Sequence, residues 1–204
     1  MKIDTQFFHE VDLQNALLLG DDDGRSLIEK ELIPEALEEG SKIENLIIEK
    51  EVRLGIENIY IPDIMAFHMT RYKKLIFFDV HIFELKKDEV RLDALSQILR
   101  YRNYVEAYFK RNKVFNGLLK NKKLRFHCHL VGKMNHWTYG DSFYTMLYCQ
   151  KNISIVNHTY ELHPLNGLQI SSFSKCQSIR INQDDNSLQY IENAIIEGLN
   201  PESN

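Results

Sequence analysis

The pattern of apolar and polar positions predicts a chain that passes repeatedly between strands and helices. Strands are expected where β-branched and aromatic residues gather, at 46–54, 59–67, 74–85, 120–131, 153–162 and 168–173. Helices are expected where apolar residues recur every three or four positions, at 26–39, 88–109, 141–149 and 187–199. This order predicts one mixed α/β domain over residues 1–204, with its core at about 26–173 and a C-terminal helix.

Turn-forming residues divide these elements. Gly55-Ile56-Glu57-Asn58 is expected to turn between the first two strands and so to make a hairpin. Pro34 is expected either to kink the first helix or to open a second turn. The helix at 88–109 carries the widest apolar face, which predicts that it packs against the strand before it.

Composition narrows the class of protein. The chain has 204 residues, of which 44% are hydrophobic and 26% charged, as is usual for a globular protein. No apolar run reaches the roughly 18 residues of a membrane span, and the N-terminus has no signal-peptide pattern. Cys128, Cys149 and Cys176 are odd in number and far apart, so we expect reduced thiols and a cytoplasmic protein.

Charge is unevenly distributed along the chain. The net charge is −4, yet residues 71–133 hold 16 Lys and Arg against 6 Asp and Glu. Such a segment can attract a polyanion locally, although a well-solvated surface explains the same pattern. If the segment binds nucleic acid, the expected phosphate contacts are Lys73, Lys74, Lys87, Arg91 and Arg100.

Three polar residues, Glu84, Lys86 and Gln97, occupy positions where apolar residues would be buried more easily. Glu84 and Lys86 are two residues apart near a strand end, so their side chains share one face of the strand. Gln97 lies on the apolar stripe of the next helix and faces that strand. Asp63 follows Pro62 in IYIPDIMAF. Carboxylates at such a strand end suit Mg²⁺, which prefers oxygen ligands.

Pro62-Asp63, then Glu84-x-Lys86, then a helix with Gln97 resembles the PD-(D/E)XK nuclease superfamily. The resemblance covers residues 26 to about 109 and implies a restriction-endonuclease-like mixed sheet flanked by helices. It implies a Mg²⁺- or Mn²⁺-dependent deoxyribonuclease that binds DNA and pairs as a homodimer. Asp63, Glu84 and the carbonyl of Leu85 would hold the ion. Lys86 would act at the scissile phosphate, and Gln97 would order the site.

The resemblance also implies an acid on the first helix, for which Glu29 is the first choice and Glu31 the competitor. A catalytically inactive protein of the same fold, which binds nucleic acid or another protein, is the alternative.

The remaining polar candidates are expected to be structural residues or contact residues rather than catalytic ones. His127 and His129 share a strand face and are expected to be partly buried rather than to bind zinc. Asp79 and His81 are expected to contact a helix or a partner.

The aromatic residues of the long helix are expected to lie mainly in the core. Tyr101, Tyr104, Tyr108 and Phe109 follow its apolar spacing. An exposed tyrosine among the neighbouring arginines and lysines could instead stack on a nucleic-acid base.

Overall fold

The structure is a computed structural model that describes residues 9–54, 60–119, 122–135, 153–163 and 167–177. Its main element is a six-stranded sheet in the order β1-β2-β3-β5-β7-β8. These strands are β1 (Lys42–Lys50), β2 (Ile64–Tyr72), β3 (Leu75–Leu85), β5 (Lys123–Gly132), β7 (Ile153–His163) and β8 (Gly167–Gln177). β4 (Glu89–Val90) and β6 (Met134–Asn135) form a separate two-stranded parallel pair.

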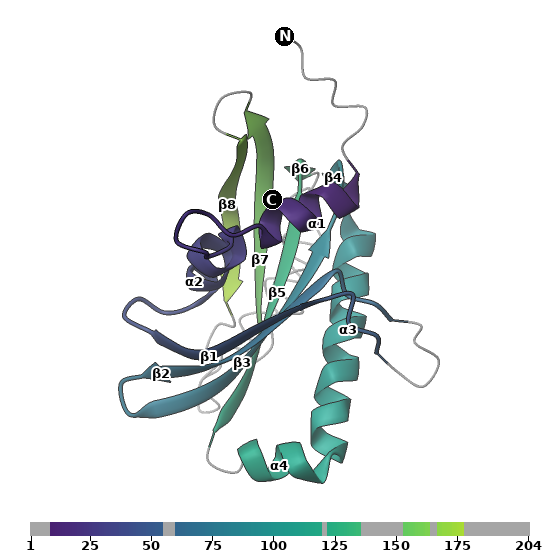
Figure 1. The fold of residues 1–204 in the computed structure, drawn as a ribbon. Coiled ribbons are helices and arrows are strands. Elements are labelled where there is room, and N and C mark those ends of the chain that lie inside the picture. The colour runs from purple at the N-terminus through teal and green to yellow at the C-terminus, as the bar shows by residue number, and fades with distance from the viewer. Residues whose placement is uncertain (1–8, 55–59, 120–121, 136–152, 164–166, 178–204) are drawn as a thin grey trace, which may run out of the picture.

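The sheet is mixed. β3, β5 and β7 run parallel to one another, while β1–β2, β2–β3 and β7–β8 are antiparallel pairs. The antiparallel β2–β3 pair turns at Lys73, whose φ of 55° is in the left-handed region. The sheet twists strongly, so the β1–β2–β3 half is turned relative to the β7–β8 half (Figure 1).

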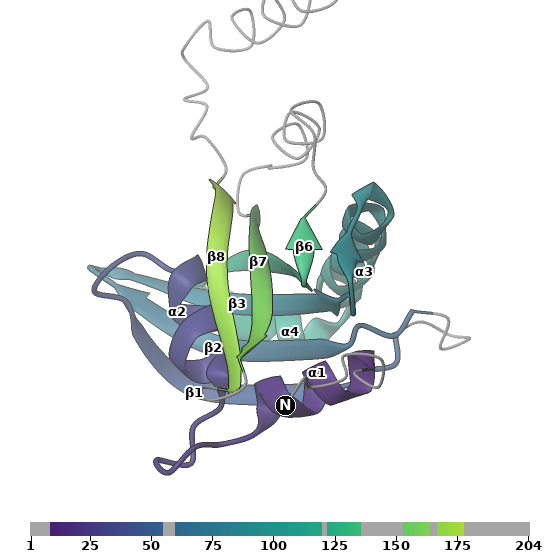
Figure 2. The same ribbon diagram turned by 90° about the horizontal axis from the view of Figure 1, so that it is seen from above.

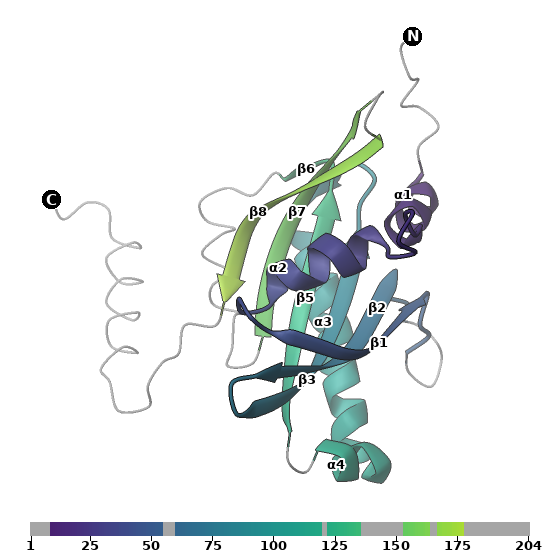
Figure 3. The same cartoon turned by 60° about the vertical axis from the view of Figure 1, so that its left-hand side comes forward.

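Helices cover both faces of the sheet. α3 (Leu92–Arg111) lies along one face and continues into α4 (Lys113–Leu119). α1 (Glu10–Leu18), a π-helical turn η2 (Ile28–Leu32) and α2 (Ile33–Ala36) lie on the other. Figure 2 and Figure 3 show the sheet between these two groups. A mixed sheet with helices on both faces follows from strands that are apolar on both sides.

Each face of the sheet has its own apolar core. Val80 and Ile82 of β3 pack with Ile98, Val105 and other residues of α3. On the opposite face, Phe83 and Leu85 pack with residues of α1 and η2, such as Leu13, Leu17 and Ile28. Alternate residues of β3 therefore feed different cores, which places Glu84 on the α3 face.

The predicted mixed α/β class is confirmed, and several elements match closely. The strand expected at 74–85 is β3, and those expected at 120–131 and 153–162 are β5 and β7. The helix expected at 88–109 is α3, although it begins at Leu92 because Glu89–Val90 pairs with β6. Pro34 lies in the first turn of α2, directly after η2.

Other element boundaries were wrong. β1 and β2 do form the expected antiparallel pair, but they span Lys42–Lys50 and Ile64–Tyr72 rather than 46–54 and 59–67. α1 and α4 were not predicted. The turn at 55–58 and the helices expected at 141–149 and 187–199 lie outside the described residues. No helix in the described part of the chain has the length and hydropathy needed to cross a membrane.

Candidate active site

Asp63 lies immediately before β2, beside the C-terminal end of β3. Its Oδ2 atom accepts a hydrogen bond of 2.7 Å from the backbone N–H of Leu85. Its backbone carbonyl accepts hydrogen bonds from the Gln14 amide at 2.7 Å and from the Glu51 N–H at 3.0 Å. These contacts hold the Asp63 carboxylate against the residue that follows Glu84.

Glu84 and Lys86 share one face at the end of β3, as their spacing predicted. The Nζ atom of Lys86 lies 2.6 Å from Oε1 of Glu84. The Glu84 side chain is 2% exposed and that of Lys86 is 25% exposed. The second Glu84 oxygen, Oε2, is buried and has no hydrogen-bond partner among the described residues. A buried carboxylate oxygen without a partner is costly and calls for a cation or a donor.

The electrostatics of these acids reflect burial and mutual repulsion. Burial raises the pKa of Glu84 to about 7, and the nearby charge of Asp63 adds to the rise despite the hydrogen bond from Lys86. Burial also raises the pKa of Asp63, against the hydrogen bond from Leu85. Burial alone would lower the pKa of the Lys86 amine. The negative charges near it have the larger combined effect and raise this pKa; they belong to Glu84, Glu10 and Asp63. Two acids with raised pKa values beside a lysine are typical of a functional site.

Gln97 joins this group through α3. Its Nε2 atom donates a hydrogen bond of 2.6 Å to the Tyr101 hydroxyl, four residues along the same helix. Burial raises the pKa of Tyr101, and the charges of Glu84 and Asp63 raise it further. The structure therefore brings the side of α3 that carries Gln97 toward the end of β3. Among the described residues, the hydrogen bond of Gln97 goes to Tyr101 and not to Asp63, Glu84 or Lys86.

α1 supplies a glutamate that the sequence patterns did not predict. Oε1 of Glu10 accepts a hydrogen bond of 3.3 Å from the Lys87 N–H. The negative charge of Glu10 helps to raise the pKa of Asp63, Glu84 and Lys86. With Glu10, the cluster draws its side chains from α1, the loop before β2, the end of β3, and α3.

The first-helix acid is therefore placed differently from the expectation. Oε2 of Glu29 accepts hydrogen bonds from the Ser26 N–H at 2.8 Å and the Ser26 hydroxyl at 3.2 Å, so Glu29 closes its own helical turn. The competitor, Glu31, is exposed. Neither contacts Asp63 or Glu84 in any interaction that the structure shows for the described residues. The signal for Glu10 lay in the helical spacing of Leu13 and Leu17, both fully buried.

The expected phosphate-binding residues separate into two regions. Lys87 and Arg91 line a surface recess of about 550 Å³, and its other lining residues are Glu10, Lys86, Asp88 and Glu89. Lys73 and Lys74 lie at the other end of β3, roughly 30 Å away at about 3.3 Å per residue, so they do not share this recess. Arg100 is exposed on α3. A contact of any of them with DNA stays a prediction.

His127 and His129 were predicted to be partly buried and are almost completely buried, and His129 belongs to a chain of histidines within the sheet. His68 and His81 lie 2.8 Å apart at their Nε2 atoms, and the chain continues to His129 and then His158 at 2.9 Å per step. Beside it, Asp79 accepts hydrogen bonds from the Arg125 guanidinium at 2.6 and 3.0 Å and lies 2.9 Å from His127. The partners of Asp79 and His81 are thus on neighbouring strands rather than on a helix.

The donor set is open rather than a closed metal cage. In the ranges that the structure describes, no three His, Cys, Asp or Glu side chains are gathered so that they hold a metal ion by themselves. Mg²⁺ keeps several waters and often binds through one or two carboxylates. Oε2 of Glu84 is buried and has no hydrogen-bond partner in the part of the chain that the structure describes, which fits such an ion near Asp63.

Comparisons with protein-family models, with curated proteins and with solved structures find no match to this chain. The functional argument therefore depends on the geometry of the site.

Proposed function

We propose that this protein is a metal-dependent nuclease that hydrolyses DNA phosphodiester bonds, with a restriction-endonuclease-like arrangement of its sheet. The observation that carries the proposal is the meeting of Asp63, Glu84 and Lys86 at one strand end, with Oε2 of Glu84 buried and unpartnered among the described residues. Burial disfavours the charged form of both carboxylates, and a divalent cation bound between them would stabilise that charged form.

The proposed roles follow from the positions of the side chains. Asp63 and Glu84, with the carbonyl of Leu85 as the resemblance implies, would hold Mg²⁺ or Mn²⁺. Glu10 replaces Glu29 as the proposed acid from the first helix, because the charge of Glu10 raises the pKa of both Asp63 and Glu84. When bound, such an ion lowers the pKa of a coordinated water and stabilises charge on the phosphate.

The lysine and the helix residues complete the proposed site. Lys86 is the half-buried ammonium beside Glu84, placed to orient the attacking water or to stabilise charge on a phosphate oxygen. Gln97 holds the Tyr101 hydroxyl and so fixes the wall of the site without adding charge. Lys87 and Arg91 of the recess would receive the flanking phosphates, with Arg91 exchanging its ion pair with Glu89 for a phosphate.

A second candidate is a protein of the same fold that binds nucleic acid or a protein without cleaving it. The ion pair between Lys86 and Glu84, at 2.6 Å, favours this candidate because it already balances one carboxylate charge without a metal. The two candidates differ in what a divalent ion does. A nuclease binds the ion and cleaves, whereas the binding module does neither.

The test is cleavage of single-stranded, double-stranded and branched DNA with Mg²⁺ or Mn²⁺. Wild type should cut at least one form, and Glu84→Gln should cut none. Glu10→Gln should lower the rate, while the matched variant Glu31→Gln should not, because Glu31 is exposed and away from the cluster. A wild-type protein that cuts no DNA form, or a Glu84→Gln variant that cuts normally, would contradict the proposal.

A further inference from the structure

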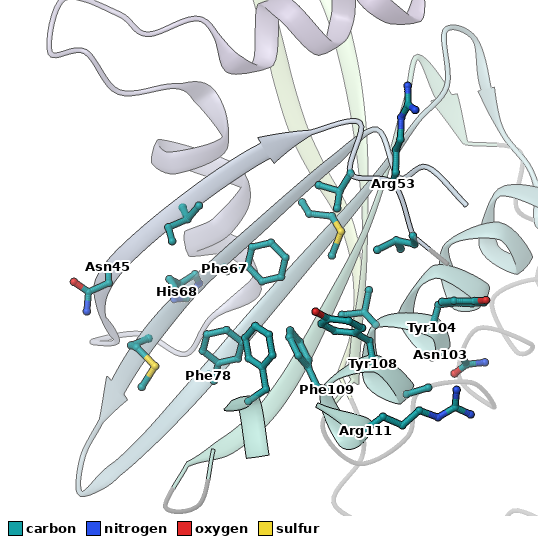
Figure 4. Close-up of a pocket in the computed structure, with 18 residues that line it drawn as sticks. Asn45, Arg53, Phe67, His68, Phe78, Asn103, Tyr104, Tyr108, Phe109 and Arg111 are labelled. Carbon is teal, nitrogen blue, oxygen red and sulfur yellow. The ribbon is translucent and has the colours of Figure 1, made fainter. Parts of the chain in front are cut away.

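A large groove lies between the twisted β1–β2–β3 half of the sheet and helices α3 and α4. Its volume is about 1090 Å³, comparable to the largest ligand sites of proteins. Strands contribute Phe67 and Phe78, and the helices contribute Tyr104, Tyr108 and Phe109 (Figure 4). The proposed catalytic cluster uses none of these residues.

The aromatic rings form a nearly continuous row along the groove. Neighbouring centroids lie 6.5 Å apart for Phe67 and Phe78, 5.8 Å for Phe78 and Phe109, and 4.6 Å for Phe109 and Phe115. Tyr104 is 40% exposed and Tyr108 is 56% exposed, so part of the surface is open. Exposed rings of this kind can stack on bases, whatever the sequence.

The charge of the groove identifies the kind of occupant. None of the 18 residues that line it is acidic, although the chain has 29 Asp and Glu. Arg53, Arg111 and the amides Asn45 and Asn103 are among them, and Figure 4 shows all four at the margin of the set. Aromatic rings bordered by cations and amides match a polyanion with flat aromatic bases, whose faces stack on the rings and whose polar edges can bond to the amides.

The groove also connects to the proposed catalytic cluster. The Tyr60 ring lies 4.9 Å from that of Tyr104, which lines the groove, and 6.2 Å from that of Tyr101. Tyr101 in turn bonds to Gln97. From Gln97 to Arg111 the helix spans about 21 Å at 1.5 Å per residue. A single strand with a phosphate at Glu84 and Lys86 can therefore follow α3 into the groove.

We propose that this groove binds the unpaired bases of a single-stranded nucleic acid whose backbone crosses the Glu84–Lys86 site. The inference rests on the proposed nuclease function for the position of the cleaved phosphate. It names the substrate class, a strand with unpaired bases, because paired bases cannot reach rings inside a groove.

The test is the binding of labelled oligothymidine, measured by fluorescence anisotropy in EDTA so that no cleavage occurs. A duplex of equal length and an abasic strand of equal length are the comparison probes. Wild type should bind oligothymidine more tightly than either. Tyr104→Ala and Tyr108→Ala should each weaken binding by about 5- to 150-fold, the range for one lost stacking contact.

Two further variants separate stacking from other causes. Tyr108→Phe should bind as wild type, because it keeps the ring and loses only the hydroxyl. Tyr72→Ala, a tyrosine of β2 that does not line the groove, should also bind as wild type. The mass of each variant in solution shows whether the groove instead holds a second copy of the chain.

The outcomes distinguish this inference from the proposed function. If neither tyrosine variant weakens binding, if the duplex binds as tightly as the single strand, or if the variants change only the oligomeric state, the groove inference is overturned. Cleavage that depends on Glu84 would survive that result. If oligothymidine binds through the tyrosines but wild type cuts no DNA, the groove assignment holds and the nuclease proposal fails.

Discussion

Oδ2 of Asp63 accepts a hydrogen bond of 2.7 Å from the N–H of Leu85, twenty-two residues later in the chain. The bond fixes the start of β2 against the end of β3, directly beside Glu84. Asp63 therefore has a structural task besides its proposed role as a metal ligand, and substitutions can separate the two.

We predict that Asp63→Ala and Asp63→Asn both abolish metal-dependent cleavage but differ in stability. Alanine leaves the Leu85 N–H without its acceptor, which costs about 1–3 kcal/mol of unfolding free energy. Asparagine keeps an acceptor oxygen at that position and should cost less. Urea unfolding followed by circular dichroism measures the difference. Equal destabilisation by the two variants would show that this hydrogen bond contributes little.

The raised pKa of Glu84 predicts an unusual dependence of stability on pH. Burial moves this pKa from its usual 4.5 to about 7. Between pH 4.5 and pH 7 the Glu84 carboxyl therefore keeps its proton in the folded protein, whereas the unfolded chain has released it. Stability from this group is therefore greatest below pH 4.5 and declines as the pH rises through 7. The total is on the order of 3 kcal/mol at 1.36 kcal/mol per pKa unit.

The measurement compares wild type with Glu84→Gln, which stays neutral, by urea unfolding in EDTA at pH 5 and pH 8. Glu84→Gln should gain stability relative to wild type at pH 8 and not at pH 5. Glu31→Gln is the matched control, because its side chain is exposed and should show no such difference. An equal difference in unfolding free energy between wild type and Glu84→Gln at both pH values would contradict the raised pKa of Glu84.

Short-range patterns predicted the part of the site that lies on one strand and one helix. The two-residue spacing of Glu84 and Lys86 placed both on one face of β3. The helical spacing around Gln97 placed it beside Tyr101, on the side of α3 that faces the sheet. Both predictions depend only on the period of a strand or a helix, which is fixed by backbone geometry.

Contacts between distant segments could not be predicted in the same way. Glu10 reaches Lys87 across 77 positions, and the position of α1 is set by packing of Leu13 and Leu17 on the far face of the sheet. The histidine chain depends on the register of neighbouring strands, which no single strand encodes. A homodimer stays a prediction.

Lys86 provides the sharpest test of the chemical proposal. Lys86→Ala should retain divalent-ion binding, because Asp63 and Glu84 remain, yet lose about 10²–10³ in kcat, as is common when one charge-stabilising group is removed. Calorimetric titration with Mn²⁺ and single-turnover cleavage measure the two properties separately. Loss of ion binding together with the rate would show that Lys86 supports the carboxylates rather than the reaction.

The histidine chain predicts that the fold is labile to acid. His68, His81 and His158 are buried, and burial lowers the pKa of each, to about 4 for His158. Their rings therefore stay neutral in the folded protein, whereas the unfolded chain takes up protons below about pH 6.5. Stability from these groups is fully present above 6.5 and is lost as the pH falls toward 4.

His81 lies in the middle of this chain, between His68 at 2.8 Å and His129 at 2.9 Å, so replacing it tests the chain most directly. His81→Leu removes both hydrogen bonds and should cost about 1–3 kcal/mol at pH 7. It should also reduce the acid slope by about 1.36 kcal/mol per pH unit, the value for one proton. An unchanged slope in His81→Leu would mean that this imidazole takes up its proton in the folded protein as readily as in the unfolded chain, which its complete burial argues against.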